Sequence, residues 1–332
     1  MSVHDKYKVV LTDYVWPSPD VEKRILSDVA DITVLNTTQP EDFLAHVGDC
    51  DALLNTYAGP ITAEIMAAMP KCRIIARYGI GVDTIDLQAA TEAGIIVTNN
   101  PDYCVDEVAD HTLALLLGGV REAFRLDRHV RAGGWDVMQG INAFRLKGKV
   151  LGLIGFGKIA RRVAGRAAAF GLEIIYHDPY LESPPEDPVA RPVDLDVLLR
   201  EADILSLHVP LTETSRGMFG DELFGRMKRG VIFLNVSRGP IVDTMALVRA
   251  LDAGIVAACM LDTVDPEPLH ADHPLRGRDN VTITPHAAWY SKESMVALQS
   301  GAPNEVRKVL MGTWPLNVVN PAVKKKNRAG IQ

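Results

Sequence analysis

The segment from Lys149 to Pro179 constrains the fold more than any other part of this chain. It opens with Val150 to Ile154, a run that is apolar apart from one glycine and too short for a helix, which predicts a strand buried on both faces. A glycine-rich turn follows, and then a segment with apolar residues at helical spacing that stops at Gly171. A second short strand is predicted from Glu173 to His177 and ends at Asp178. The order is therefore strand, turn, helix, strand and acid.

Small residues occupy the three key positions of a G-x-G-x-x-G/A turn, namely Gly155, Gly157 and Ala160. The first permits a tight turn, the second lets backbone approach a pyrophosphate, and the third brings the helix close to the strand. The helix N-terminus offers unpaired N–H groups and a partial positive charge to a diphosphate. Asp178 comes about twenty residues later, where a carboxylate holds a ribose 2′-hydroxyl and repels a 2′-phosphate. The segment predicts binding of NAD rather than NADP.

Composition limits the remaining possibilities. The chain has 332 residues, enough for two domains, and is 47% hydrophobic and 23% charged, as globular proteins are. A net charge of −7 argues against a nucleic-acid surface, and no run approaches the roughly twenty apolar residues of a membrane span. The N-terminus lacks a signal-peptide core, and the four cysteines show neither metal-like nor disulfide-framework spacing. We therefore expect a cytoplasmic protein without a metal.

Short apolar runs alternate with helical segments on both sides of the glycine turn. Such a repeated pattern predicts parallel sheets covered by helices. A long connector helix is expected from Val105 to Arg131, and the last helix, at 292–311, should return to the first domain. Before the turn, strands are expected at 7–11, 32–35, 52–55, 73–76 and 95–98. After the turn, strands are expected at 204–208, 231–236, 256–261 and 281–284.

The predicted fold is α/β with two Rossmann-like, doubly wound parallel-sheet domains. Residues 1–101 and 288–332 should form a flavodoxin-like substrate-binding domain, which is discontinuous and completed by the C-terminal helix. Residues 102–287 should form the NAD-binding domain and include the connector helix. Because a long helix with a loose arm often buries apolar surface on a second subunit, we expect a homodimer. The basic segment from Lys324 to Arg328 should fray in solvent.

Polar groups follow three predicted strands, at Asn235–Gly239, Asp262–Leu269 and Thr284–Ala288. Active sites of doubly wound proteins lie at the carboxyl ends of strands, so these groups should meet. Histidine suits proton delivery to a carbonyl oxygen near neutral pH, and a neighbouring carboxylate would orient its ring. An arginine could then clamp a substrate carboxylate in a bidentate geometry that lysine cannot reproduce.

Less specific interpretations compete with this one. Arg238 and Glu267 could form only a structural ion pair. His270 and His273, with nearby acids, resemble a metal cluster, but a loop rich in Pro and Asp favours solvated turns. His111 lies within the connector helix and is expected to be a packed or capping histidine.

The ordered set of motifs resembles the D-isomer-specific 2-hydroxyacid dehydrogenases over nearly the whole chain. The resemblance implies that Arg238 binds the substrate carboxylate and carbonyl, that His286 is the general acid/base, and that Glu267 is the partner of that histidine. Besides the glycine turn, the motifs are HVPLT at 208–212, NVSRGPIVD at 235–243, LDTVDPEPL at 261–269 and TPHAAW at 284–289.

The same resemblance assigns binding residues. Asp262 would hold the nicotinamide carboxamide, and Trp289 would face the substrate side chain. The stretch RYGIGVDTID matches the family loop whose backbone N–H groups bind the substrate carboxylate. That loop places the expected contacts at Tyr78, Gly79 and Ile80, with Arg77 as a second cationic contact. Further cofactor contacts are expected at Lys158, Ile159, Val209, Pro210 and Val236.

The function that follows is an NAD-dependent oxidoreductase that reduces a 2-oxo acid to a D-2-hydroxy acid, or runs the reverse. Substrate and direction stay open, although Glu267 disfavours formate, because family members acting on formate are expected to carry glutamine there. The alternative is an NAD(H)-gated scaffold similar to the C-terminal-binding-protein corepressors, with closure or dimerisation set by the dinucleotide. The set of Arg238, Glu267 and His286 favours an enzyme with a small acid, and neither nucleic acid nor membrane, as partner.

Overall fold

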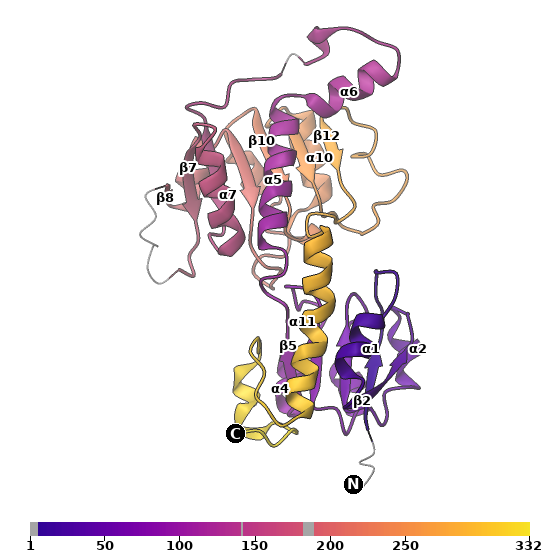
Figure 1. Cartoon of the computed structure of the whole chain (residues 1–332). Coiled ribbons are helices and arrows are strands. Elements are labelled where there is room, and N and C mark those ends of the chain that lie inside the picture. The colour runs from indigo at the N-terminus through magenta and orange to yellow at the C-terminus, as the bar shows by residue number, and fades with distance from the viewer. Residues whose placement is uncertain (1–5, 141, 182–188) are drawn as a thin grey trace. The chain divides into compact units, whose positions relative to one another are not determined.

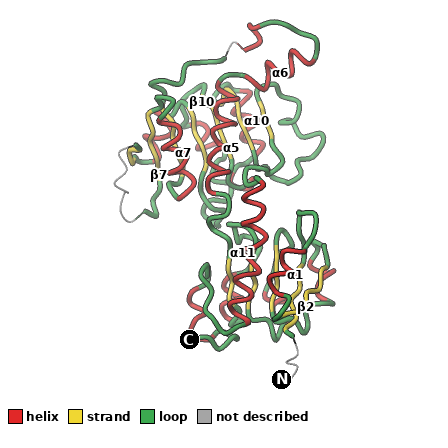
Figure 2. Tube along the Cα trace, in the orientation of Figure 1, coloured by secondary structure: helices red, strands yellow, loops and turns green. Residues whose placement is uncertain are grey.

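The computed structural model describes residues 6–140, 142–181 and 189–332, and the chain divides into two compact units (Figure 1). The first unit comprises Met1–Cys104 and Ser291–Gln332, and the second comprises Val105–Tyr290. Each unit holds one parallel sheet flanked by helices (Figure 2). The predicted α/β class with two parallel-sheet domains is confirmed.

The first unit is built on a five-stranded parallel sheet. The strands at 52–55 and 74–77 are buried at every residue, which explains why they are nearly continuous apolar runs in the sequence. Each expected strand of this sheet forms, with boundaries within two residues of the prediction. In spatial order the strands are β2 (Ala30–Val34), β1 (Tyr7–Leu11), β3 (Ala52–Asn55), β4 (Ile74–Arg77) and β5 (Ile96–Thr98).

Side-chain caps determine where helices of the first unit begin. The carboxylate of Asp86 accepts a hydrogen bond from the N–H of Ala89 at 2.8 Å and begins α4. Ser291 and Ser294 form a capping box at the start of α11, which returns from the second unit and packs against α1 and β4. The predicted return of the last helix to the first domain is therefore seen. The helices are α1 (Asp20–Leu26), α2 (Pro40–Leu44), α3 (Ala63–Ala67), α4 (Leu87–Glu92) and α11 (Lys292–Leu310).

The C-terminal segment packs against the first unit, so the expectation that it frays was wrong. Val318 bridges Thr98 at the edge of β5, and Asn320 accepts a hydrogen bond from the N–H of Val97 at 2.9 Å. The short helix η3 (Pro321–Lys326) follows, and the N–H of Arg328 donates to the carbonyl of Gly94 at 2.8 Å. These bonds cover an edge strand whose backbone groups would otherwise face solvent.

Glu22 of α1 is fully buried and accepts a hydrogen bond from the hydroxyl of Tyr78 at 3.2 Å. Burial raises the pKa of Glu22 above its ordinary value of 4.5. The folded state then holds the proton of Glu22 more tightly than the unfolded state. The contribution of this group to the free energy of unfolding is therefore complete below pH 4.5 and is lost as the pH rises through the folded pKa. Glu22→Gln should reduce this loss of stability, seen as a smaller drop in Tm between pH 5 and pH 8. An equal drop in both proteins would contradict the assignment.

The second unit holds a seven-stranded parallel sheet. The chain crosses from β6 to β7 on one side and then returns to β9 on the other side of β6, and ligands of doubly wound sheets bind at such a reversal. The short edge strand β8, of sequence Ala-Arg-Pro, has no apolar alternation and was not predicted. In spatial order the strands are β12 (Val281–Ile283), β11 (Val256–Leu261), β10 (Val231–Asn235), β9 (Ile204–Leu207), β6 (Val150–Ile154), β7 (Glu173–His177) and β8 (Ala190–Pro192).

The connector is two helices, so the prediction of one helix across 105–131 was wrong. Glu122 takes a left-handed conformation with φ 55° and separates α5 from α6. The turn lays the ring of Phe124 on Gly118, at a place where any Cβ would clash. α5 itself packs against α7, β10 and β11. The helices of the unit are α5 (Val105–Val120), α6 (Ala123–Arg131), η1 (Val137–Gly140), α7 (Lys158–Ala168), α8 (Leu195–Glu201), α9 (Asp221–Gly225), η2 (Gly239–Ile241) and α10 (Thr244–Asp252).

Candidate active site

The glycine turn lies between β6 and α7, at the sheet reversal. Gly155 has φ 85°, and a Cβ there would lie 2.6 Å from the carbonyl oxygen of His208, so a side chain is excluded. Gly157 caps α7, and a Cβ at this position would meet nothing within 4 Å. Lys158 and Ile159 form the first turn of α7. The turn therefore presents backbone to an open position at a helix N-terminus, which fits a pyrophosphate.

Asp178 follows β7 and faces the same turn. One carboxylate oxygen accepts a hydrogen bond from the N–H of Phe156 at 2.9 Å, and the other accepts one from the N–H of Tyr180 at 3.1 Å. The Phe156 ring stacks on Tyr176 with centroids 3.8 Å apart, which fixes the turn against β7. Each carboxylate oxygen can accept about two hydrogen bonds, so the bonds of the described residues leave one position on each for a ligand. These residues fit the diphosphate and ribose of a dinucleotide.

The ends of β9 and β10 complete this edge of the sheet. Val209 and Pro210 follow β9, and Val236 follows β10 and is buried. The Ser237 hydroxyl donates to the carbonyl of Leu207 at 2.7 Å and ties the two strand ends together. The predicted cofactor contacts, with Asp262 after β11, thus follow five neighbouring strands of one sheet, β7, β6, β9, β10 and β11.

Arg238 is held by the turn that ends β10. The side chain of Asn235, which is buried, donates to the carbonyl of Arg238 at 2.9 Å and accepts from the N–H of Ser237 at 3.0 Å. The guanidinium of Arg238 donates to the carbonyl of Ser237 at 2.9 Å. Gly239 comes next, and any Cβ there would collide with the backbone of Val264, in the loop that also carries Glu267. This close contact brings the two loops together.

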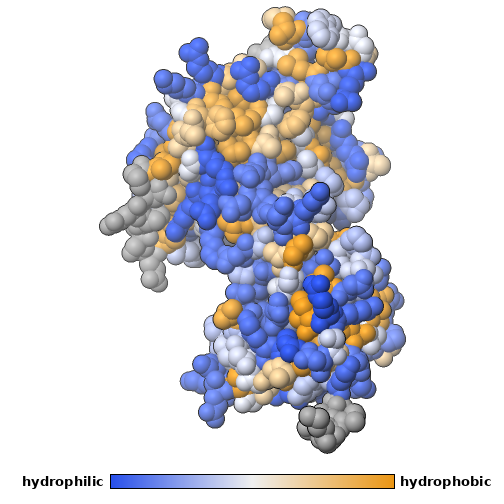
Figure 3. Space-filling model, in the orientation of Figure 1, coloured by the Kyte–Doolittle hydropathy of each residue, from blue (hydrophilic) through white to orange (hydrophobic). Residues whose placement is uncertain are grey.

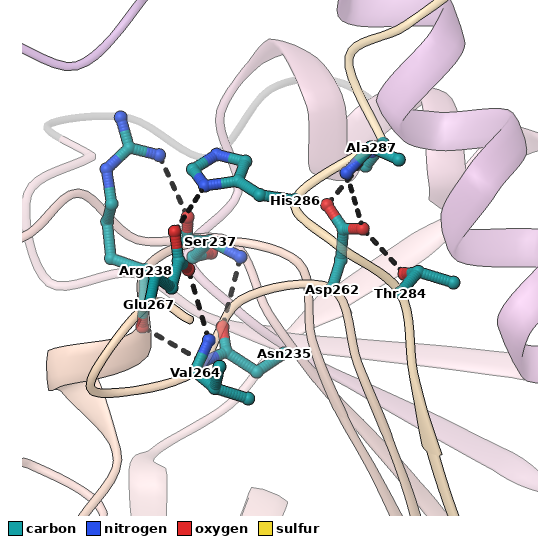
Figure 4. Close-up of polar contacts among 10 residues, drawn as sticks. Asn235, Ser237, Arg238, Asp262, Val264, Glu267, Thr284, His286 and Ala287 are labelled. Atoms are coloured by element: carbon teal, nitrogen blue, oxygen red, sulfur yellow. Dashed lines mark hydrogen bonds and ion pairs between the residues drawn. The ribbon is translucent and has the colours of Figure 1, made fainter. Parts of the chain in front are cut away.

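Glu267 and His286 form a hydrogen-bonded dyad (Figure 4). The Nδ1 atom of His286 lies 2.8 Å from Oε2 of Glu267, and Oε1 of the same carboxylate accepts from the N–H of Val264 at 3.1 Å. Figure 4 shows the guanidinium of Arg238 beside the imidazole of His286, above Glu267. The structure therefore brings together the three predicted catalytic side chains, from three separate strand ends. The carboxylate of Glu267 is thus bonded both to the histidine and to the backbone of its own loop.

A buried carboxylate, Asp262, anchors the loop that carries His286. Its Oδ1 accepts from the hydroxyl of Thr284 at 2.6 Å and from the N–H of Ala287 at 2.8 Å, and its Oδ2 accepts from the N–H of Ala288 at 2.9 Å. Burial by itself would raise the pKa of Asp262, but hydrogen bonds from His111, Thr284 and the backbone of Ala288 and Ala287 lower it. The group is therefore ionised at neutral pH.

A pocket of about 530 Å³ opens beside the dyad. Its wall is largely apolar and includes Leu269, Leu275 and Ile283, while Glu267 and His286 supply polar groups. Apolar pockets with a few convergent polar groups are typical ligand sites. Among the described residues, no group of three or more His, Cys, Asp or Glu could hold a metal ion.

The loop after β4 belongs to the first unit. The N–H of Tyr78 donates to the carbonyl of Asn55 at 2.9 Å, and the Tyr78 side chain points into the core beside Trp16. Within the described chain, the N–H groups of Gly79 and Ile80 donate to no acceptor. Tyr78 is therefore the least suited of the three predicted contacts.

Arg77 and Trp289, the other two predicted substrate contacts, lie in different environments. The guanidinium of Arg77 is buried, lies 5.6 Å from the ring centroid of Tyr57 and curls over Gly79, where a Cβ would lie 3.0 Å from its Nη1. A buried cation beside the Gly79 backbone gives this loop positive character. Trp289 is half-buried and packs edge-on against Tyr290, with centroids 5.7 Å apart.

His111 was expected to be only a packed or capping residue, but it reaches the polar network. Its Nε2 lies 3.1 Å from the hydroxyl of Thr284 and 3.5 Å from Oδ1 of Asp262. No motif or spacing links position 111 to position 284, so the sequence held no signal for this contact.

Comparison with known proteins identifies the family of the chain. The family model of the D-isomer specific 2-hydroxyacid dehydrogenase NAD-binding domain matches residues 113–288. The chain is 40% identical to a glyoxylate reductase of Korarchaeum cryptofilum over 87% of this chain and 88% of that protein. It is 36% identical to a glyoxylate reductase of Aeropyrum pernix over 98% of this chain and 99% of that protein.

Solved structures of related enzymes also match the fold of this chain. A glyoxylate reductase from Paecilomyes thermophila superposes with a TM-score of 0.88 at 30% identity, covering 96% of this chain and 99% of that one. A D-lactate dehydrogenase from Aquifex aeolicus, complexed with NAD and lactic acid, superposes with a TM-score of 0.84 at 29% identity, covering 96% of this chain and 98% of that one. The chain belongs to the D-isomer specific 2-hydroxyacid dehydrogenase family and is an NAD-dependent oxidoreductase of that family.

Proposed function

We propose that the protein interconverts a small 2-oxo acid, glyoxylate or hydroxypyruvate, and the corresponding 2-hydroxy acid, with a D product where the product is chiral. The observation that carries the chemistry is the dyad of His286 and Glu267, 2.8 Å apart, with Arg238 beside it. The substrate size is supported by relatives named glyoxylate reductase and, in Blautia hydrogenotrophica, hydroxypyruvate reductase.

His286 would move the proton. Because its Nδ1 faces Glu267, we assign the proton transfer to its Nε2. In reduction the imidazolium donates the Nε2 proton to the carbonyl oxygen as that oxygen gains charge, and in oxidation the neutral ring takes the hydroxyl proton back. The carboxylate of Glu267 holds the ring orientation and stabilises the imidazolium.

Arg238 would bind the substrate carboxylate and polarise its carbonyl, since a guanidinium offers two parallel donors. The N–H groups of Gly79 and Ile80, in the loop over which Arg77 curls, are proposed as further substrate contacts. NADH, when bound at the glycine turn and Asp178, supplies the hydride. Asp262 would accept one hydrogen bond from the nicotinamide carboxamide, because the bonds of the described residues leave one acceptor position on its Oδ2.

A panel of five oxo acids tests this proposal. NADH oxidation should show its highest kcat/KM with glyoxylate or hydroxypyruvate, and lower values with phenylpyruvate, 4-methyl-2-oxovalerate and 3-phosphohydroxypyruvate. A maximum with phenylpyruvate would contradict the proposed size of the substrate. Background rates with all five acids would contradict the proposed reaction.

Asp178→Ser should change the cofactor preference. The substitution removes an acceptor for the ribose 2′-hydroxyl, and a hydrogen bond to a charged group contributes about 1.5–3 kcal/mol. The KM for NADH should therefore rise roughly 10–100-fold, while the KM for NADPH falls because repulsion of its phosphate is relieved. Steady-state kinetics with both cofactors checks this, and an unchanged ratio of the two kcat/KM values would refute the role of Asp178.

We propose that the segment of α6 and η1, residues 123–140, forms a homodimer interface, and we call it the connector arm. Trp135, Val137 and Met138 are 90%, 78% and 66% exposed, and Figure 3 shows apolar residues at the arm end of the second unit. Exposed apolar clusters of this kind mark interaction sites. Trp135→Asp combined with Met138→Asp should raise the dimer dissociation constant by at least about 100-fold, as measured by sedimentation equilibrium. Met311→Asp, at an exposed methionine of the first unit, is the matched control. A monomeric wild type would contradict the proposal.

We also propose that the protein acts in the cytoplasm. The four cysteines are free and buried, as expected in a reducing compartment. Among the described residues, no helix is long and apolar enough to cross a membrane. Fractionation of cells that express the chain, followed by immunoblotting, tests this proposal, and recovery outside the cytoplasmic fraction would refute it.

A further inference from the structure

A chain of hydrogen bonds runs from α5 to the backbone of His286. The Nε2 atom of His111 lies 3.1 Å from the Thr284 hydroxyl, and that hydroxyl donates to Oδ1 of Asp262 at 2.6 Å. The carboxylate of Asp262 then accepts from the N–H groups of Ala287 and Ala288, the two residues that follow His286. Residues far apart in the sequence are thus connected to the residue that carries the proton.

The direction of these bonds is determined by their chemistry. An ionised carboxylate only accepts, so the single proton of the Thr284 hydroxyl goes to Asp262. The hydroxyl oxygen must then accept from His111, and Nε2 of His111 must carry a proton in both the neutral and the charged ring. His111 therefore acts as a donor that holds the hydroxyl in one rotamer.

The anchored backbone is in an unfavourable conformation. His286 has φ 52°, in the left-handed region, which is unfavourable for a residue that carries a Cβ. Its own N–H donates to the carbonyl of Asp262 at 2.8 Å. The bonds to Asp262 from His286, Ala287 and Ala288 hold three consecutive amides and stabilise this conformation, which aims the imidazole at Glu267. Loss of the anchor would allow the loop to relax to an ordinary conformation.

We propose that His111 is a positioning residue, which acts through Thr284 and Asp262 to hold His286 in its left-handed conformation and so keep the imidazole in place for proton transfer. This inference rests on the proposed role of His286 and adds a residue outside the substrate and cofactor contacts. The burial and ionisation of Asp262 agree with it, because a buried carboxylate needs its hydrogen bonds satisfied to stay in one orientation.

Two substitutions break this chain of hydrogen bonds at different points. His111→Leu removes the donor and keeps a side chain of similar bulk, and Thr284→Val removes the hydroxyl and keeps the branched shape. His111→Gln is the rescue variant, because its amide nitrogen can donate from a position similar to that of Nε2. Thr112→Val is the matched control, since Thr112 is a buried neighbour on α5 whose hydroxyl donates within the helix to Val108.

Kinetics is the first readout. His111→Leu and Thr284→Val should each lower kcat about tenfold, because a small misplacement of a catalytic group is enough for such a loss. KM for the oxo acid should change much less than kcat, and His111→Gln should recover most of the rate. The double variant should be no slower than the slower single variant, since both substitutions break the same chain of hydrogen bonds. Wild-type kcat in His111→Leu, or losses that multiply in the double variant, would overturn the inference.

Hydrogen exchange is the second readout and does not depend on activity. Peptides covering residues 284–290, followed by mass spectrometry, report the protection of the amides of His286, Ala287 and Ala288. We expect about tenfold faster exchange in His111→Leu and Thr284→Val than in wild type or Thr112→Val. Unchanged protection would overturn the inference even if wild type reduced none of the oxo acids, a result that would separately refute the proposed function. If His111→Leu does not fold, Thr284→Val decides.

Discussion

His286→Ala lowers kcat for glyoxylate reduction by about 10²–10⁴-fold, the usual contribution of a positioned general acid. The substitution removes the Nε2 proton that the carbonyl oxygen needs as it gains charge. Water cannot replace this donor well, because it is not held by Glu267 as the ring is at 2.8 Å. Binding of NADH should stay as in wild type, because the glycine turn and Asp178 lie at other strand ends. Steady-state kinetics gives kcat, and quenching of protein fluorescence gives NADH affinity.

The control for this prediction is His270→Ala. His270 is exposed and lies in the same loop as Glu267, so its removal tests whether any histidine of this region affects turnover. It also tests the metal alternative, since His270 was the centre of that interpretation. We expect wild-type rates in His270→Ala. An active His286→Ala enzyme would remove His286 from the mechanism, and an inactive His270→Ala enzyme would reopen the question of a metal.

Most of this architecture could be predicted from the sequence, because parallel strands that are buried on both faces consist of continuous apolar runs. β3 and β10 are buried along their whole length, and both were expected from such runs. The site followed from topology, since the carboxyl ends of parallel strands share one edge of the sheet. That rule alone placed Arg238, Glu267 and His286 near one another before any distance was known.

What the sequence could not show depends on tertiary contacts. The break between α5 and α6 requires Phe124 to pack on Gly118, and neither residue by itself predicts a turn. Tyr78 was predicted as a substrate contact through its backbone N–H, and that N–H donates to the carbonyl of Asn55 at the end of β3. The contact of His111 with Thr284 joins α5 to the loop after β12. Periodicity carries no information about such long-range pairs of side chains.

Arg238→Gln should lower kcat/KM for the oxo acid by roughly 10²–10⁴-fold. The guanidinium offers two parallel donors to a carboxylate or carbonyl, and each charge-assisted hydrogen bond contributes about 1.5–3 kcal/mol. Glutamine keeps one amide donor but loses the charge and the second donor. Both kcat and KM should change, because the same group binds the carboxylate in the ground state and polarises the carbonyl in the transition state. Initial rates over a range of glyoxylate concentrations separate the two constants.

Arg238→Lys distinguishes charge from geometry. Lysine restores the positive charge but presents it as a single point on a flexible stem, so it cannot reproduce the bidentate contact. We therefore expect Arg238→Lys to recover part of the activity and to remain well below wild type. Arg249→Gln on α10 is the matched control, because Arg249 is exposed and is paired with Asp221 at 2.7 Å on the surface. If Arg238→Lys matched wild type, charge alone would account for substrate binding, and the bidentate contact would be wrong.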